Sequence, residues 1–175
     1  MTRSLITCLI LASLIVTSCT TPPPEKYFDV AVLNTNMLHG FAGEGMEREL
    51  EAPSLKAVPG TDKPVQMPRK EVVESTLKFN EEAYGKVNEL KETEDAKDIM
   101  QASKALYAFV LPVYKNEYTQ LADLYDKQAP KESIDALQKN IREKYEARFM
   151  ELYAALTTSG KAYAQKHNIN VKWAD

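Results

Sequence analysis

The sequence predicts a mainly α-helical protein: an elongated antiparallel bundle of three to four helices with an irregular N-terminal arm. Two observations support this fold class. After Pro68, apolar residues recur at spacings of three and four, the period of an amphipathic helix, and charged residues fill the positions between them. Before Pro68, glycine and proline are frequent and this period is absent. Residues 28–175 are therefore expected to form one domain, with the arm packed on the bundle.

The composition is that of a single folded domain. Of the 175 residues, 44% are hydrophobic and 27% charged, which argues against both a disordered chain and a multi-span membrane protein. One of the 22 basic residues, Arg3, lies in the N-terminal segment discussed next, and the 21 others against 25 acidic residues give a net charge of −4. This acidic balance argues against a nucleic-acid partner, because phosphate contacts need a basic surface.

Residues 1–18 have the organisation of a signal peptide. The basic Arg3 precedes an apolar run over residues 5–16, which is short for a transmembrane helix of about 20 apolar residues. Two small residues then lead directly to Cys19. A cleaved signal is therefore favoured over a permanent membrane span.

The four residues Val16-Thr17-Ser18-Cys19 resemble the lipobox of bacterial lipoproteins, which has an aliphatic residue, two small residues and an obligatory cysteine. The resemblance implies that the signal is cut before Cys19 and that the Cys19 thiol carries a diacylglyceryl group. Several acyl chains, at roughly 0.8 kcal/mol per buried methylene, form a stable membrane anchor. The expected location is the bacterial cell envelope, and Thr20 favours the outer membrane in a Gram-negative host. The alternative is an ordinary secretory signal.

A tether is expected after the anchor. Residues 19–27 contain Pro22-Pro23-Pro24, which favours polyproline II geometry and a semi-rigid spacer. The other cysteine, Cys8, lies inside the signal, so the body has no thiol. Disulfides, cysteine-zinc clusters and thiol nucleophiles are therefore excluded from the body.

The arm, residues 28–68, has one candidate strand. The β-branched and apolar run at 28–33 predicts a short strand, followed by a turn at 34–36. Beyond it, only residues 46–51 could form a helical turn or two, since glycine and proline interrupt the rest.

The first long helix is expected from Pro68 to near Lys91. A proline suits the first helical turn, and Glu71 and Glu74 lie near the positive end of the helix dipole. Gly85 inside the helix costs about 1 kcal/mol relative to alanine. The apolar stripe consists of Val72, Thr76, Phe79, Ala83, Val87 and Leu90.

The second helix is expected from Thr93, a candidate N-cap, to Asp126. Pro112 in its interior removes one backbone hydrogen bond and clashes with the preceding turn. We therefore expect either a kink near residues 108–112 or two helices in place of one.

The strongest periodicity follows Pro130 and predicts the third long helix. The helix is expected to continue through Gly160 to His167, with Asn168 closing it and residues 169–173 forming a short tail. At about 1.5 Å per residue, the long helices would reach roughly 50 Å. The stripe consists of Ile134, Leu137, Ile141, Tyr145, Phe149, Leu152 and Leu156.

Residues suited to catalysis or metal binding are few. The two histidines, His39 and His167, lie outside the spacings of di-iron, zinc-protease and c-type haem motifs, so no metal or cofactor is expected. The glycine-rich segment 40–45 lacks the Gly-Lys-Ser/Thr ending of a phosphate loop and is interpreted as a flexible connector.

Four tyrosines along the second helix are the candidate binding surface. Tyr107, Tyr114, Tyr118 and Tyr125 lie along one side of that helix, where they could line a groove for a ligand or partner. The alternative is packing at the boundary of the core with the hydroxyl groups in water.

The resulting functional hypothesis is a lipid-anchored, non-enzymatic helical bundle that acts by binding. Its partners would be the membrane, through the lipid on Cys19, and either an envelope protein or a small apolar ligand in a cleft between helices. One alternative is an envelope hydrolase that uses His39 and the glycine-rich arm. The other is a purely structural spacer.

Overall fold

The computed structural model describes residues 21–173, and Cys19 and the predicted signal peptide lie outside this range. The described chain is mainly helical, which confirms a helical bundle. The helices are α1 (Pro24–Ala31), α2 (Glu44–Glu51), α3 (Arg69–Glu89), α4 (Lys97–Val113), α5 (Thr119–Asp126) and α6 (Lys131–Lys166). A 3-10 helix, η1 (Leu33–Leu38), follows α1, and a π-helical turn, η2 (Tyr114–Tyr118), joins α4 to α5.

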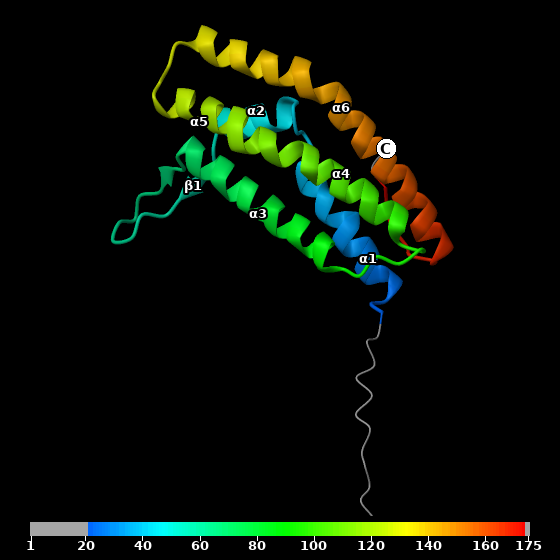
Figure 1. Cartoon of the computed structure of the whole chain (residues 1–175). Coiled ribbons are helices and arrows are strands. Elements are labelled where there is room, and N and C mark those ends of the chain that lie inside the picture. Colours follow the sequence, from blue (N-terminus) through cyan, green and yellow to red (C-terminus); the bar gives the residue numbers. More distant parts are fainter. Residues whose placement is uncertain (1–20, 174–175) are drawn as a thin grey trace, which may run out of the picture.

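The long helices pack side by side. In Figure 1 the chain runs along α3, returns along α4 and α5, and reverses again along α6. Helix α4 packs against both α3 and α6, and α1 contacts all three of these helices. The apolar faces meet in one continuous hydrophobic core. Within residues 21–173, no helix combines the length and the apolar character needed to cross a membrane.

Helix α6 has the extent that its periodicity predicts. Pro130 precedes its first residue, and its 36 residues correspond to about 54 Å. Asn168 lies just beyond the C-cap, with a φ of 56°, the left-handed conformation that ends many helices. Buried positions along it include Ile134, Ile141, Phe149 and Leu156.

The C-terminal tail closes one end of the bundle. The Trp173 ring packs edge-on against Phe28 of α1, with 5.9 Å between the ring centroids. Both α1 and the tail approach α6 at Gly160, where an added Cβ would lie 3.1 Å from Val32 Cγ1 and 3.3 Å from the Trp173 ring. A glycine at this position therefore allows the three segments to pack closely.

The helical path continues through Pro112, and the irregularity falls after it. Residues 114–118 form the wider π-helical turn, and the Thr119 hydroxyl donates to the Tyr114 carbonyl at 3.1 Å. Pro112 lacks the N–H that would pair with the Ala108 carbonyl, and the π-helical turn departs from the regular pattern only after it, at residues 114–118. The break expected near residues 108–112 is thus replaced by a local widening one turn later.

The strand predicted at residues 28–33 is wrong, because helix α1 occupies most of this run. Pro24 at the first helical position and Glu25 in the first turn favour a helix start. Phe28 is fully buried, as are its neighbours on the same face, so packing outweighs the β-propensity of the valines. The predicted tether, residues 19–27, is shorter than expected because α1 begins at Pro24.

A small hairpin in the arm was not predicted. Strands β1 (Leu55–Lys56) and β2 (Val65–Gln66) pair antiparallel and project from the side of the bundle in Figure 1. An ion pair between Lys56 and Glu71 connects the hairpin to α3. With two residues per strand, no alternating apolar pattern is long enough to be recognised in the sequence.

Asp95 connects the loop before α4 to the end of α6. A hydrogen bond from Lys166 and the nearby charge of His167 hold the pKa of Asp95 below its ordinary value, against the opposing effect of desolvation. The His167 Nε2 atom lies 2.7 Å from Asp95 Oδ2. A lowered carboxylate pKa stabilises the fold above the unfolded-state pKa, near 4, and this contribution disappears as the pH falls through the folded-state pKa.

We therefore expect Asp95→Asn to lower the melting temperature at pH 6 and to have little effect at pH 2.5. Because Asp95 is partly exposed, the loss at pH 6 should be below about 1 kcal/mol. Thermal unfolding followed by circular dichroism measures both values. Asp62→Asn, at an exposed position in the hairpin loop, is the control and should be neutral at both pH values. An equal loss at the two pH values for Asp95→Asn would contradict the assignment.

Candidate functional site

The structure places the tyrosine stripe in the core, so the predicted binding surface is wrong for three of its four members. Tyr107, Tyr114 and Tyr118 are buried, and burial raises the pKa of each phenol well above its usual range. Tyr125 is partly exposed, and its hydroxyl accepts a hydrogen bond from Gln138 Nε2 at 3.1 Å. These side chains hold helices together and do not form an exposed surface.

The glycine-rich segment is a tight turn between η1 and α2, not a flexible connector. Gly40 has a φ of 86° and its carbonyl accepts hydrogen bonds from the N–H groups of Gly43 and Met46, at 3.1 and 3.4 Å. An added Cβ on Gly40 would lie 2.8 Å from the Gly45 Cα, so the two backbones touch. Glycine is therefore required at this crossing.

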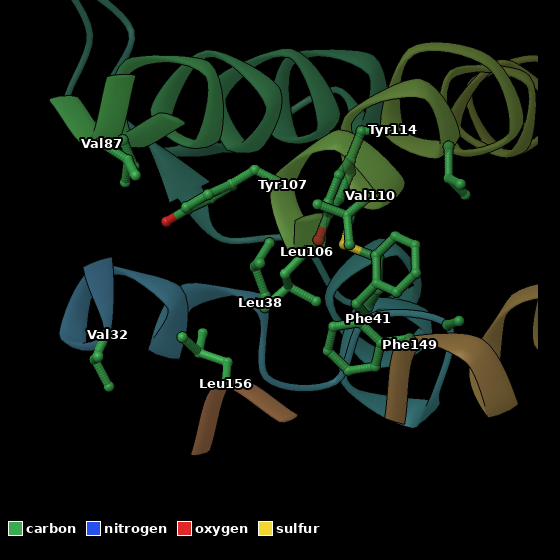
Figure 2. Close-up of a cluster of buried hydrophobic side chains, with 14 of the residues drawn as sticks. Val32, Leu38, Phe41, Val87, Leu106, Tyr107, Val110, Tyr114, Phe149 and Leu156 are labelled. Carbon is green, nitrogen blue, oxygen red and sulfur yellow. The ribbon is translucent and has the colours of Figure 1, made fainter. Parts of the chain in front are cut away.

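Phe41 anchors this turn in the bundle. Its ring centroid lies 4.9 Å from that of Phe149 on α6 and 5.5 Å from that of Tyr114. Contacts at 5.9 Å with Tyr118 and 6.2 Å with Phe109 complete an aromatic cluster. In Figure 2, Phe41 and Phe149 lie next to each other beneath Tyr114. The cluster fixes residues 39–45 against α6.

One hydrogen bond fastens the same turn to η2. The backbone N–H of Ala42 donates to the Tyr118 hydroxyl oxygen at 2.8 Å in a buried position. Tyr118→Phe would leave this N–H without an acceptor, and we expect the free energy of unfolding to fall by about 1–3 kcal/mol in urea titrations. Tyr107→Phe is the matched control, because the Tyr107 hydroxyl is buried without a partner and its removal should be neutral or stabilising. Equal losses in the two variants would contradict this role of Tyr118.

The anchored turn forms one wall of a surface cleft of about 350 Å³. The turn and the first residues of α2 lie on one side, and α6 lies on the other. Apolar atoms come from Phe41, Phe149, Met150 and Tyr153, and Met150 is 56% exposed although its side chain is large and apolar. The volume falls in the lower part of the range of small-molecule sites, roughly 300–1,000 Å³.

The polar side chains of the cleft carry opposite charges. Glu44 and Glu146 are acidic, Arg48 is basic, and His39 lies exposed at the rim. Arg48 donates from Nε to the Glu44 carbonyl at 3.3 Å. A second surface hollow adjoins, in which Arg142 pairs with Glu47 at 2.5 Å. The first cleft therefore combines apolar side chains with exposed polar groups of both charges.

Neither histidine lies in a metal site. In the described part of the chain, no group of three or more histidine, cysteine, aspartate or glutamate side chains is arranged to hold a metal ion. His39 lies beside the cleft, whereas His167 is the C-cap of α6 and contacts Asp95. The two histidines therefore belong to separate regions.

Comparison with known proteins gives no match. No protein-family model, curated protein or solved structure is significantly similar to this chain. The function must therefore be argued from the cleft itself.

Sequence reasoning found one wall of the cleft and missed the other. His39 and the glycine-rich turn were identified, but Glu146, Met150 and Tyr153 on α6 were not. Met150 falls outside the apolar stripe of α6, on the face that periodicity assigns to solvent. Met150 alone gave no usable signal, because single exposed apolar residues are common on protein surfaces.

Proposed function

We propose that this protein is a lipid-anchored, non-enzymatic component of the bacterial cell envelope that binds a small, partly apolar ligand in the cleft between the glycine-rich turn and α6. The lipid on Cys19 would hold an elongated antiparallel bundle at the membrane, the outer membrane in a Gram-negative host. The ligand would contact Phe149, Met150 and Tyr153.

The observation that carries this proposal is the construction of the cleft. A cavity with an apolar floor and a few polar groups is the usual form of a small-molecule site. Here its wall is fixed by Phe41 and by the Ala42–Tyr118 hydrogen bond, so little ordering is needed when a ligand binds. A purely structural spacer would not require this arrangement.

A hydrolase is the second candidate, because His39 lines the same cleft as Glu146 and Tyr153. A general base needs a partner that orients it. His39 is exposed at the rim of the cleft, and no described side chain within residues 21–173 holds its imidazole in place, so binding is the better-supported function. If the protein hydrolysed a chromogenic ester and His39→Ala abolished this activity, hydrolysis would become the better-supported function.

The anchor is tested by phase partitioning of the protein expressed in a bacterial host. Wild-type protein should enter the detergent phase, and Cys19→Ala should shift from the detergent phase to the aqueous fraction because the acyl chains are absent. Attachment of labelled palmitate to Cys19→Ala would contradict lipidation at this residue.

Ligand binding is tested with a neutral probe, benzyl alcohol, on the lipidated protein in lipid nanodiscs. With 13C-methyl-labelled methionine, we expect the Met150 methyl signal to shift and saturate as the probe is added. Met37 is the internal control, because it is 60% exposed, comparable to Met150, but lies outside the cleft. Equal, unsaturated shifts of both signals, or none, would contradict a binding site.

A further inference from the structure

We propose that the cleft selects ligands with a positively charged amine or quaternary ammonium group next to their apolar part. This inference rests on the proposed function and specifies the ligand class. Three observations support it. They are the charges in the cleft, the approach of Glu146 on α6 to the start of α2, and the aromatic rings that line the cleft.

The two carboxylates of the cleft, Glu44 and Glu146, form no ion pair within the part of the chain that the structure describes. Both lie close enough to Arg142 to act on its charge. Arg142 is already paired with Glu47, and its Nε atom is buried. It therefore cannot turn into the cleft without breaking that pair, and the two carboxylates remain available to a cationic ligand.

An anionic ligand is disfavoured, because a carboxylate of the protein already lies at the start of α2, where an anion would bind. The free N–H groups at the start of a helix attract negative charge. At the start of α2, however, Glu146 of α6 already lies beside the backbone, with Oε1 3.9 Å from the position that a Cβ on Gly43 would occupy. Glu44 adds a second negative charge in the first turn. A carboxylate or phosphate ligand would meet both.

The aromatic rings of the cleft favour a cation as well. Tyr153 is partly exposed in the cleft, with its ring centroid 5.6 Å from that of the buried Phe149, and aromatic faces attract ammonium groups. Met150 offers a flexible, polarisable side chain to the apolar part of the ligand. The same helix already uses this interaction, since Lys144 Nζ lies 4.8 Å from the Tyr145 centroid.

Arg48 is the basic residue of the cleft, so its removal should change cation binding in the opposite direction to the removal of Glu146. Its Nε is bound to a backbone carbonyl, which leaves its positive charge uncompensated by an ion pair in the described chain. Removing Arg48 should therefore strengthen the binding of a cation, whereas removing Glu146 should weaken it. A cleft that recognises only apolar surface would respond to neither change.

The experiment compares three benzyl compounds at about pH 8 in the nanodisc preparation, with the Met150 methyl signal as the readout: benzyltrimethylammonium, benzyl alcohol and phenylacetate. We expect the dissociation constant to be lowest for benzyltrimethylammonium and highest for phenylacetate. Glu146→Gln should weaken cation binding roughly threefold to fivefold, and Arg48→Gln should strengthen it by a similar factor, as expected for partly exposed charges. Benzyl alcohol binding should change less than benzyltrimethylammonium binding in both variants, because benzyl alcohol carries no charge.

Two outcomes would overturn the inference and are distinguishable from failure of the proposed function. If benzyl alcohol saturates the Met150 signal but benzyltrimethylammonium binds no more tightly, the cleft is a site without charge selection. If phenylacetate binds most tightly, the selection has the opposite sign. The absence of a saturable Met150 response to benzyl alcohol, by contrast, removes the site itself.

Discussion

Replacing Phe41 with alanine is expected to lower the free energy of unfolding by about 3–5 kcal/mol, the cost typical of a fully buried phenylalanine. Phe41 is 2% exposed and packs against Phe149 on α6 and Tyr114 and Tyr118 on η2. The variant loses these contacts and leaves a void beneath the turn. Urea unfolding followed by circular dichroism measures the change.

Phe79→Ala is the matched control. The substitution removes the same atoms, but Phe79 is 42% exposed on α3. Its loss should be below about 1.5 kcal/mol. The Met150 methyl signal gives a second readout, since collapse of the turn after Phe41→Ala should also abolish the saturable response to benzyl alcohol. Comparable losses for the two phenylalanines would show that Phe41 does not anchor the turn.

Replacing Gly40 with alanine is the second large expected effect, a loss of roughly 2–4 kcal/mol. Two costs act together: a φ of 86° is strained for an L-residue, and the new Cβ would lie 2.8 Å from the Gly45 Cα. The neighbouring atom is backbone, so it cannot move aside as a side chain would. The variant should unfold at lower urea concentration than wild type.

Two other glycines separate these costs. Gly60 has a φ of 79° and no atom within 4 Å of an added Cβ, so Gly60→Ala should show the conformational cost alone, about 1–2 kcal/mol. Gly85 lies inside α3 with open space around it, and Gly85→Ala should stabilise the protein by about 1 kcal/mol. If Gly40→Ala were no worse than Gly60→Ala, the Gly40–Gly45 contact would be unimportant.

The long helices could be predicted from the sequence because their signals are local. Proline at positions 68 and 130 marks two helix starts, and the three-four spacing marks the buried faces. For α6 even the end was predictable, since Asn168 favours the left-handed conformation that closes a helix.

Helix α1 was not predicted, because the local start signals at Pro24 and Glu25 are followed by a run that the sequence pattern assigns to a strand. The run Phe28–Leu33 is β-branched, and its helical state depends on packing against α3, α4 and α6. The burial of the tyrosines of η2 could not be predicted from the sequence for the same reason. Their spacing places them on one face, but this face is buried only by tertiary packing, which includes α3 and the ring of Phe41.

The cleft required the three-dimensional fold for a related reason. Its two walls are about a hundred residues apart in the chain, residues 39–48 and residues 146–153. Each wall alone resembles ordinary surface, a glycine-rich turn on one side and a charged helix face on the other. The chemical meaning of Glu146 appears only when it lies beside the start of α2.

The early start of α1 sets how the protein would meet its ligand. Cys19 and Pro24 are five residues apart, which spans at most about 18 Å of extended chain. With Cys19 lipidated as proposed, the start of α1 stays within that reach of the bilayer. The cleft is then confined near the membrane, and a ligand held in the same leaflet reaches it by diffusion along the membrane surface. An amphiphile concentrated in the leaflet would then fill the cleft at bulk concentrations well below its dissociation constant for the detached body.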